Sequence, residues 1–164
     1  MDASADPSVD PVATGTAEDR IVDALLARGR LKEPDLARAR RLQAETGGGL
    51  LSLLARLGLV SERDHAEACA RVLGLPLVAA KDLPELPPEP VADAPALSMK
   101  FMKQYHVVPI GESDGHVDVL AADPQDAYAL DAIRLATGRQ PRPSVALRSE
   151  IEDLIERWHG QGRS

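Results

Sequence analysis

Six arginines and one histidine–cysteine pair are the residues of this chain whose types and spacing could do chemistry. His65 and Cys69 stand four residues apart, so on a helix they would share one face and could meet. Two ligands make a poor zinc site, and a buried thiol beside a partly exposed imidazole is the simpler interpretation. The arginines could bind carboxylates or phosphates through paired hydrogen bonds, or could form a solvated helix face. They are Arg20, Arg28, Arg30, Arg38, Arg40 and Arg41.

Other residues in the sequence do not form the pattern of a catalytic site. The run Gly47-Gly48-Gly49 follows an expected helix and lacks the lysine and hydroxyl residue of a phosphate loop. The carboxylates are explained as helix caps, as with Asp123 and Asp126, or as solvated faces. We therefore predict no catalytic, cofactor-binding or metal-binding residue in this chain, which argues against an independent enzyme.

The composition of the chain argues against nucleic acid as a partner and against insertion into a membrane. The chain has 164 residues, of which 44% are hydrophobic and 27% charged, as in a globular protein. Its net charge of −7 and aromatic content of 2% argue against nucleic acid, because phosphates need positive patches and single strands need stacking platforms. The sequence lacks an apolar run of the roughly 20 residues that span a bilayer and the basic start of a signal peptide. We expect a cytoplasmic protein that does not insert into a membrane.

The elements that carry the arginines form a weak repeat. Each copy predicts a helix ended by glycine, a short apolar turn, and a second helix that opens with acidic residues. In the second copy Ser61 and Asp64 add a capping signal. The matching pairs include Leu25 with Leu54, Gly29 with Gly58, Glu33 with Glu62, and Asp35 with Asp64.

Along the chain we expect an α+β protein in four segments. These are a disordered tail at 1–16, a helical subdomain of two helix-hairpin repeats at 17–75, a proline-rich linker at 76–95, and an α+β subdomain at 96–160. A short edge strand is expected at 77–78, inside the linker.

The α+β subdomain is expected to be a small sandwich with the order α-β-β-α-β-α and a three-stranded sheet. Asp114-Gly115 predicts a hairpin between the first two strands. Asp123 is expected to cap the next helix, with Pro124 in its first position. A third strand is expected near 144–147, and all helices are expected over one face of the sheet.

Four short motifs, in their order, carry a resemblance to a known family. Over about residues 20–160 the chain resembles the N-terminal region of the type II secretion system assembly ATPase, the GspE family, in its Xanthomonas-type version. The motifs are Leu57-Gly58-Leu59-Val60-Ser61, Leu73-Gly74-Leu75-Pro76-Leu77-Val78, Val119-Leu120-Ala121-Ala122-Asp123-Pro124 and Ala136-Thr137-Gly138.

The resemblance implies a role in docking. The family's catalytic core, with its ATP and Mg²⁺, would lie beyond residue 164 in the parent ATPase, and this chain would hold no cofactor. The N-terminal region would recruit that ATPase to the cytoplasmic domain of the inner-membrane platform protein GspL, for the secretion of exoproteins. The protein would then be cytoplasmic and peripherally associated with the inner membrane through this partner.

The first hairpin is the predicted contact surface. We expect recruitment through an exposed apolar stripe flanked by arginine, which is the usual composition of interface anchors. The residues that we expect to bind the partner are Arg20, Ile21, Leu25, Arg28 and Arg30.

A related helical module, the MshEN domain, supplies an alternative hypothesis, a regulatory domain of the same ATPase class that binds cyclic di-GMP. The family motif opens with Arg-Leu-Gly. The first copy here keeps Arg20 but has Val22 at the glycine position, and the second copy has Gly49 in place of the arginine. These departures remove a close backbone approach and one contact to a phosphate or a guanine.

Overall fold

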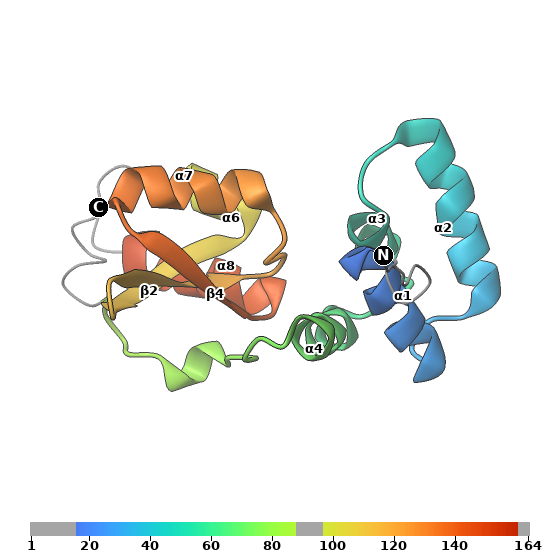
Figure 1. Cartoon of the computed structure of the whole chain (residues 1–164), viewed down its shortest axis with the longest axis horizontal. Coiled ribbons are helices and arrows are strands. Elements are labelled where there is room, and N and C mark those ends of the chain that lie inside the picture. The colour runs from blue at the N-terminus through green and yellow to red at the C-terminus, as the bar shows by residue number, and fades with distance from the viewer. Residues whose placement is uncertain (1–15, 88–96, 161–164) are drawn as a thin grey trace, which may run out of the picture. The chain divides into compact units, whose positions relative to one another are not determined.

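The computed structural model describes residues 16–87 and 97–160, and these form two compact units that divide after Leu73 (Figure 1). The expected tail at 1–15 and the linker residues 88–96 lie outside the described residues. The first unit, which we call the helical unit, contains four helices. They are α1 (Ala17–Ala27), α2 (Glu33–Thr46), α3 (Leu50–Arg56) and α4 (Glu62–Leu73).

The two copies of the repeat end their first helices with the same hydrogen bonds. Gly29 and Gly58 have φ angles of 73° and 74°, in the left-handed region that a glycine adopts without strain. The N–H of Arg30 donates to the carbonyl of Leu25 at 2.8 Å, and the N–H of Leu59 donates to that of Leu54 at 3.0 Å. Each is the outer bond of a Schellman ending, so the sequence repeat is also a structural repeat.

Local capping fixes where these helices begin. Thr16, which composition assigned to the tail, is the N-cap of α1 and forms a capping box with Asp19. The predicted cap of α4 is confirmed, since the N–H of Asp64 donates to the Ser61 hydroxyl at 3.0 Å. The core then forms where α1 packs on α4 and where α2 packs on α3.

The second unit is the predicted α+β subdomain, and its order of elements is confirmed. After a short 3-10 helix, η1 (Ala80–Asp82), come α6 (Met99–Tyr105), β2 (Val107–Ser113), β3 (His116–Ala121), α7 (Ala127–Thr137), β4 (Gln140–Val145) and α8 (Arg148–Ile155). A π-helical turn, η2 (Glu156–Gly160), continues α8. The sheet order is β2-β3-β4, with β2 antiparallel and β4 parallel to β3.

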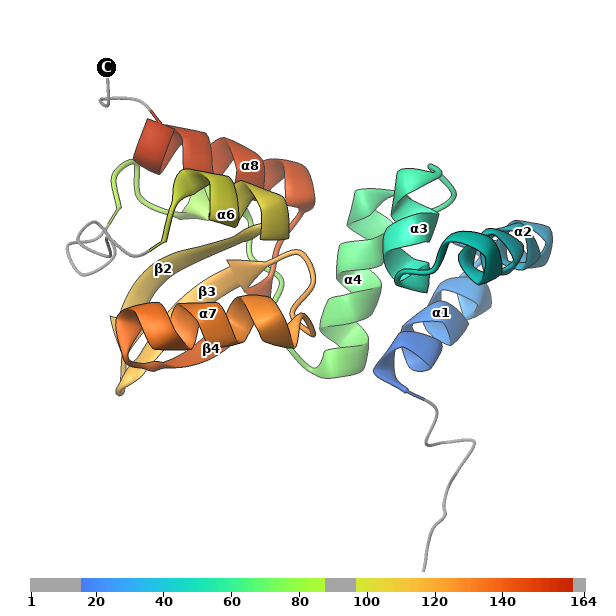
Figure 2. The same ribbon diagram turned by 90° about the horizontal axis from the view of Figure 1, so that it is seen from above.

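The expectation that all helices cover one face of the sheet is wrong. Figure 2 shows the sheet between α7 on one side and α6 with α8 on the other. Val119 and Ala121 pack with Ile133 of α7, whereas Leu120 packs with Ile151 and Leu154 of α8. The parallel pairing of β3 with β4 explains this arrangement, because α7 must cross one face of the sheet to connect the two strands. The chain then passes to the other face, where α8 packs.

The third strand also differs from the prediction, since it spans Gln140–Val145 and not 144–147. Pro141 and Pro143 hid it, because prolines are depleted in strands. In the structure the N–H of Ala146 donates to β3, whereas the N–H of Val145 donates away from β3, to Pro76. Residues 141 and 143 therefore direct their nitrogen atoms to the outer edge of β4, where the missing N–H groups remove no bond to β3.

Part of the expected linker is packed on this unit. The predicted edge strand is present as a single parallel bridge between Leu77 and Val145. The N–H of Ala80 donates to Glu150 Oε1 at 2.9 Å, and the indole of Trp158 donates to the carbonyl of Pro84 at 3.1 Å. The described residues 76–87 thus pack across the surface of the α+β unit.

Candidate functional site

The structure divides the predicted contact surface into buried and exposed parts. Ile21 is 0% exposed and Leu25 is 1% exposed, because α1 turns this stripe toward α4. The expectation that these two side chains form an exposed apolar stripe is therefore wrong. Arg20 and Arg28 are exposed, and Arg30 lies 3.6 Å from Asp64 across the two copies of the repeat.

An open groove beside α2 brings together arginines and apolar side chains at the surface of the helical unit. Its volume is about 410 Å³. Leu42 is half-buried, and Leu57, at the end of α3, is 42% exposed. The lining residues are Arg38, Arg41, Leu42, Glu45 and Leu57.

The fold of α2 explains why these side chains face outward together. Leu36 and Ala39 are buried, so the arginines on the other side of the helix lie in solvent. Arg38 contacts Asp35 at 3.3 Å, but both side chains are well exposed and the pair holds Arg38 only weakly. Among the described residues Arg41 has no ion pair, so its guanidinium is available to an outside carboxylate or phosphate.

The sequence singled out two of the five described residues that line this groove. Arg38 and Arg41 belong to the arginine group that the sequence singled out. Leu57 comes from the second copy of the repeat, and only the packing of α2 against α3 places it beside them.

A carboxylate occupies the start of α3, where the second copy of the MshEN motif would begin. Glu18 Oε2 accepts from the N–H of Leu51 at 3.4 Å and would lie 3.8 Å from a Cβ at Gly49. Val22, at the other position where the chain departs from the motif, is 1% exposed and belongs to the core. Val22 therefore has a structural role in the helical unit, and Glu18 lies beside the position where the motif has its second arginine.

The histidine–cysteine pair that the sequence singled out is partly buried on α4. Cys69 is 2% exposed, and its Sγ lies 3.6 Å from Nε2 of His65, as their spacing predicted. Over residues 16–87 and 97–160, no three His, Cys, Asp or Glu side chains are placed to hold a metal ion. Within the same ranges, the helices are too short or too polar to cross a membrane.

Asp123 does not cap α7 as expected. Asp126 takes that role, accepting from the N–H of Ala129 at 3.1 Å, and Asp123 instead accepts from the N–H of Gln125 at 3.1 Å. Desolvation by the surrounding chain raises the pKa of Asp123 above its ordinary value of 3.8. The Gln125 bond opposes this shift, Asp126 adds to it, and Arg148 opposes it more weakly.

One protein-family model matches the α+β unit. The family model of the MshEN domain matches residues 73–164. The chain belongs to the MshEN domain family. This match covers the α+β unit, whereas the resemblance to the MshEN motif was located in the helical repeat.

Two curated relatives are similar to this chain over most of its length. The chain is 64% identical, over 91% of its length, to the type II secretion system protein E of Xanthomonas campestris pv. campestris, of which it covers 26%. It is 33% identical over 79% of its length to the type IV pilus assembly ATPase PilB of Thermus thermophilus, covering 14% of that protein. The chain thus spans about a quarter or less of the length of these relatives.

Solved structures agree with the sequence comparison. The N-terminal domain of XpsE matches with a TM-score of 0.80 at 60% identity, covering 90% of this chain and 99% of that one. A structure of MshE with cyclic di-GMP matches with a TM-score of 0.65 at 24% identity, covering 85% and 99%, and shows a shared fold. The predicted resemblance to the N-terminal region of a type II secretion ATPase is confirmed.

Proposed function

We propose that this chain is the docking domain of a longer type II secretion ATPase, and that it recruits the enzyme to the cytoplasmic domain of a GspL-like platform protein. Its parent would then bind ATP and Mg²⁺ elsewhere and work in the cytoplasm at the inner membrane. The similarity to type II secretion system protein E supports the parent enzyme. The groove beside α2 supports the docking, because its arginines and apolar side chains are exposed together.

The groove has the composition of a protein-binding surface. Leu42 and Leu57 supply apolar area that a partner can bury, and Arg38 and Arg41 stand beside it. Arginine beside an apolar centre is enriched at interfaces, since it packs and also pairs with carboxylates. The predicted residues Arg20, Arg28 and Arg30 are exposed on the same unit, while Ile21 and Leu25 are buried in its core.

The test compares three double charge reversals that change the net charge equally. Arg38→Glu with Arg41→Glu alters the groove on α2, and Arg20→Glu with Arg28→Glu alters α1 and the residue that follows it. Arg63→Glu with Arg71→Glu, two exposed positions on α4, is the matched control.

Titration calorimetry with the cytoplasmic domain of the GspL-like protein from the same organism gives the readout. We expect the groove pair to weaken binding at least about tenfold, equivalent to 1.4 kcal/mol, and the control pair to bind like the wild type. A loss confined to the Arg20 and Arg28 pair would move the contact surface from the α2 groove to α1. Equal affinities for all three variants would reject an arginine-based surface.

Binding of cyclic di-GMP is the second candidate, favoured by the fold shared with MshE. Arginine next to an apolar surface also suits a phosphate and a flat base. Against it stands Glu18, whose carboxylate already occupies the start of α3. Titration calorimetry with cyclic di-GMP tests this second candidate. A saturable heat of binding that Arg41→Glu abolishes would support a nucleotide-binding function for the groove.

A further inference from the structure

The outer face of α7 carries two large apolar side chains in solvent. Tyr128 is 66% exposed and Leu135 is 73% exposed. They stand seven residues apart, or about two turns, and therefore share one face of the helix. The opposite face is already used, since Ala129 and Ile133 are fully buried against the sheet. We call the exposed residues Tyr128, Asp131 and Leu135 the α7 stripe.

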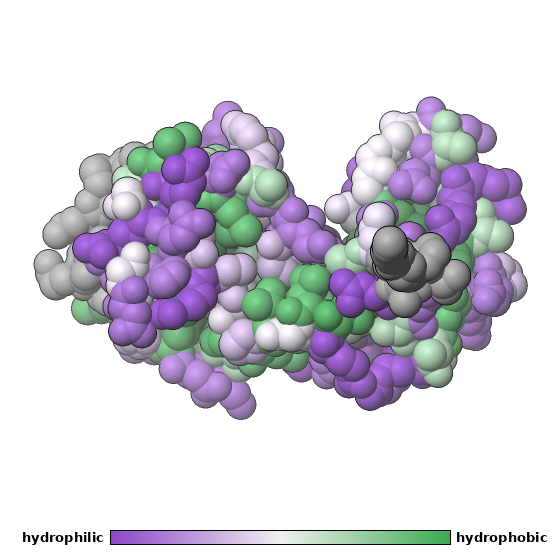
Figure 3. All heavy atoms as spheres, viewed as in Figure 1, coloured by the Kyte–Doolittle hydropathy of each residue, from purple (hydrophilic) through white to green (hydrophobic). Residues whose placement is uncertain are grey.

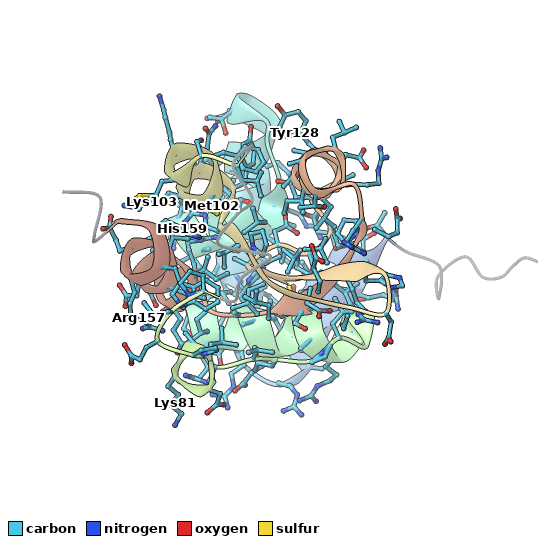
Figure 4. All side chains as sticks on the ribbon, turned by 90° about the vertical axis from the view of Figure 1, so that its left-hand side faces the viewer. Lys81, Met102, Lys103, Tyr128, Arg157 and His159 are labelled. Atoms are coloured by element: carbon cyan, nitrogen blue, oxygen red, sulfur yellow. The ribbon has the colours of Figure 1, made fainter. Side chains whose placement is uncertain are left out.

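Aromatic residues concentrate at one end of this stripe. The chain has one phenylalanine and two tyrosines, and all three form a row. The ring centroids of Phe101 and Tyr105 are 4.8 Å apart, and those of Tyr105 and Tyr128 are 5.4 Å apart. Figure 4 shows Tyr128 on the side of α7 that faces α6. Phe101 and Tyr105 pack against the core, and Tyr128 at the other end of the row is exposed. An exposed tyrosine is typical of an interface anchor.

The charge around the stripe differs from that of the groove beside α2. Asp131, within the stripe, lies 3.8 Å from Arg134 beside it, so these two opposite charges offset each other. Figure 3 shows apolar residues at the upper edge of the unit, where Figure 1 places α7. An apolar partner surface fits this face better than the acidic surface that would suit the arginine groove.

The size of the stripe indicates how its partner is held. A stable interface between free proteins buries about 800 Å² on each side, contributed by about 20–30 residues. One face of the 11-residue helix α7 cannot supply that area. A segment tethered in the same polypeptide has a millimolar effective concentration, so a small contact is enough. The relative of 64% identity has about three quarters of its length outside the part matched here.

We propose that the α7 stripe is the surface on which the ATPase portion of the same polypeptide docks, burying Tyr128 and Leu135. This inference rests on the proposed function, because it requires the parent ATPase. It gives the two units separate tasks, with the α2 groove for the platform protein and the α7 stripe for the enzyme's own remainder.

Cysteine labelling tests the proposal in the full-length protein. Leu135→Cys places a thiol in the stripe, and Asp153→Cys places one on the exposed face of α8 as the control. Cys69, the single cysteine of this chain, is 2% exposed and should react slowly. Maleimide labelling of each site is followed by peptide mass spectrometry, in the full-length ATPase and in the chain of residues 1–164.

We expect labelling at 135 to be at least about tenfold slower in the full-length ATPase, with equal rates at 153 in both proteins. Adding Tyr128→Ala should restore fast labelling at 135, while unchanged Trp158 fluorescence shows that the unit stays folded. Equal rates at 135 in the two proteins would overturn the proposal. So would protection that depends on the concentration of the short chain, or that needs the platform domain, since the occupant would then be a second copy or the platform protein.

The same samples separate this inference from the proposed function. Platform binding without protection at 135 rejects only the α7 contact, whereas protection without platform binding rejects only the docking function.

Discussion

Replacing Leu25 by alanine should strongly destabilise the helical unit, although the sequence suggested Leu25 for a partner contact. The side chain is 1% exposed, on the helix that packs against α4. Truncating a fully buried leucine costs about 2–5 kcal/mol, depending on the cavity left behind. A unit of this size has a free energy of unfolding of about 3–9 kcal/mol. The substitution therefore removes a large part of the stability of the unit.

Urea unfolding with two probes measures this effect. Far-UV ellipticity follows the helices of both units, whereas Trp158, the single tryptophan, reports on the α+β unit in which it is buried. The change in ellipticity that Trp158 fluorescence does not follow therefore belongs to the helical unit. With a slope of about 1–2 kcal/mol per molar urea, a loss of about 2–5 kcal/mol should lower the midpoint of the helical unit by about 1–5 M. Arg20→Ala, at an exposed site on the same helix, is the control and should change stability by less than about 0.5 kcal/mol. An unchanged midpoint for Leu25→Ala would refute the assignment of Leu25 to the core.

Three further predictions concern single side chains. Gly29→Ala and Gly58→Ala should each lower the free energy of unfolding, measured with urea, by about 1–2 kcal/mol, because both residues have a positive φ and an added methyl group would meet no neighbour. A large difference between the two costs would show that the two helix endings are not structurally equivalent. Arg142→Ala removes contacts to Asp118 Oδ1 at 2.9 Å and to the carbonyl of Ser113 at 3.3 Å. Because solvent reaches this ion pair, the substitution should cost less than about 1 kcal/mol in unfolding followed by Trp158 fluorescence, and less still in 1 M salt. Asp123→Asn should flatten the pH dependence of the Trp158-monitored Tm just above pH 3.8. The raised pKa means that the folded chain binds more protons than the unfolded one in that window, so wild-type stability falls as pH rises through it; a wild type and variant with parallel profiles would contradict the shift.

Features set by neighbouring residues could be predicted from the sequence. The hairpin at Asp114-Gly115 is one, because both residues take positive φ angles, 52° and 79°, as the type I′ turn requires. The Ser61 cap and the glycine helix endings are others, since each depends on hydrogen bonds within a few residues.

Features set by distant packing could not be predicted. The stripe of Ile21 and Leu25 is visible in the sequence, but only the position of α4 decides that it faces inward. The strand containing Pro141 and Pro143 is tolerable only because its nitrogen atoms face away from β3, which no local pattern shows. For the same reason the groove as a whole was not predicted, since Leu57 joins Arg38 and Arg41 through the contact of α2 with α3.

The most direct test of the docking function is a calorimetric titration of this chain with the cytoplasmic domain of a GspL-like platform protein from the same organism. A docking domain predicts saturable one-to-one binding, with a Kd of about 10 µM or tighter that weakens as salt screens the arginines. Absence of saturable binding at about 100 µM partner, with both units folded, would contradict the account.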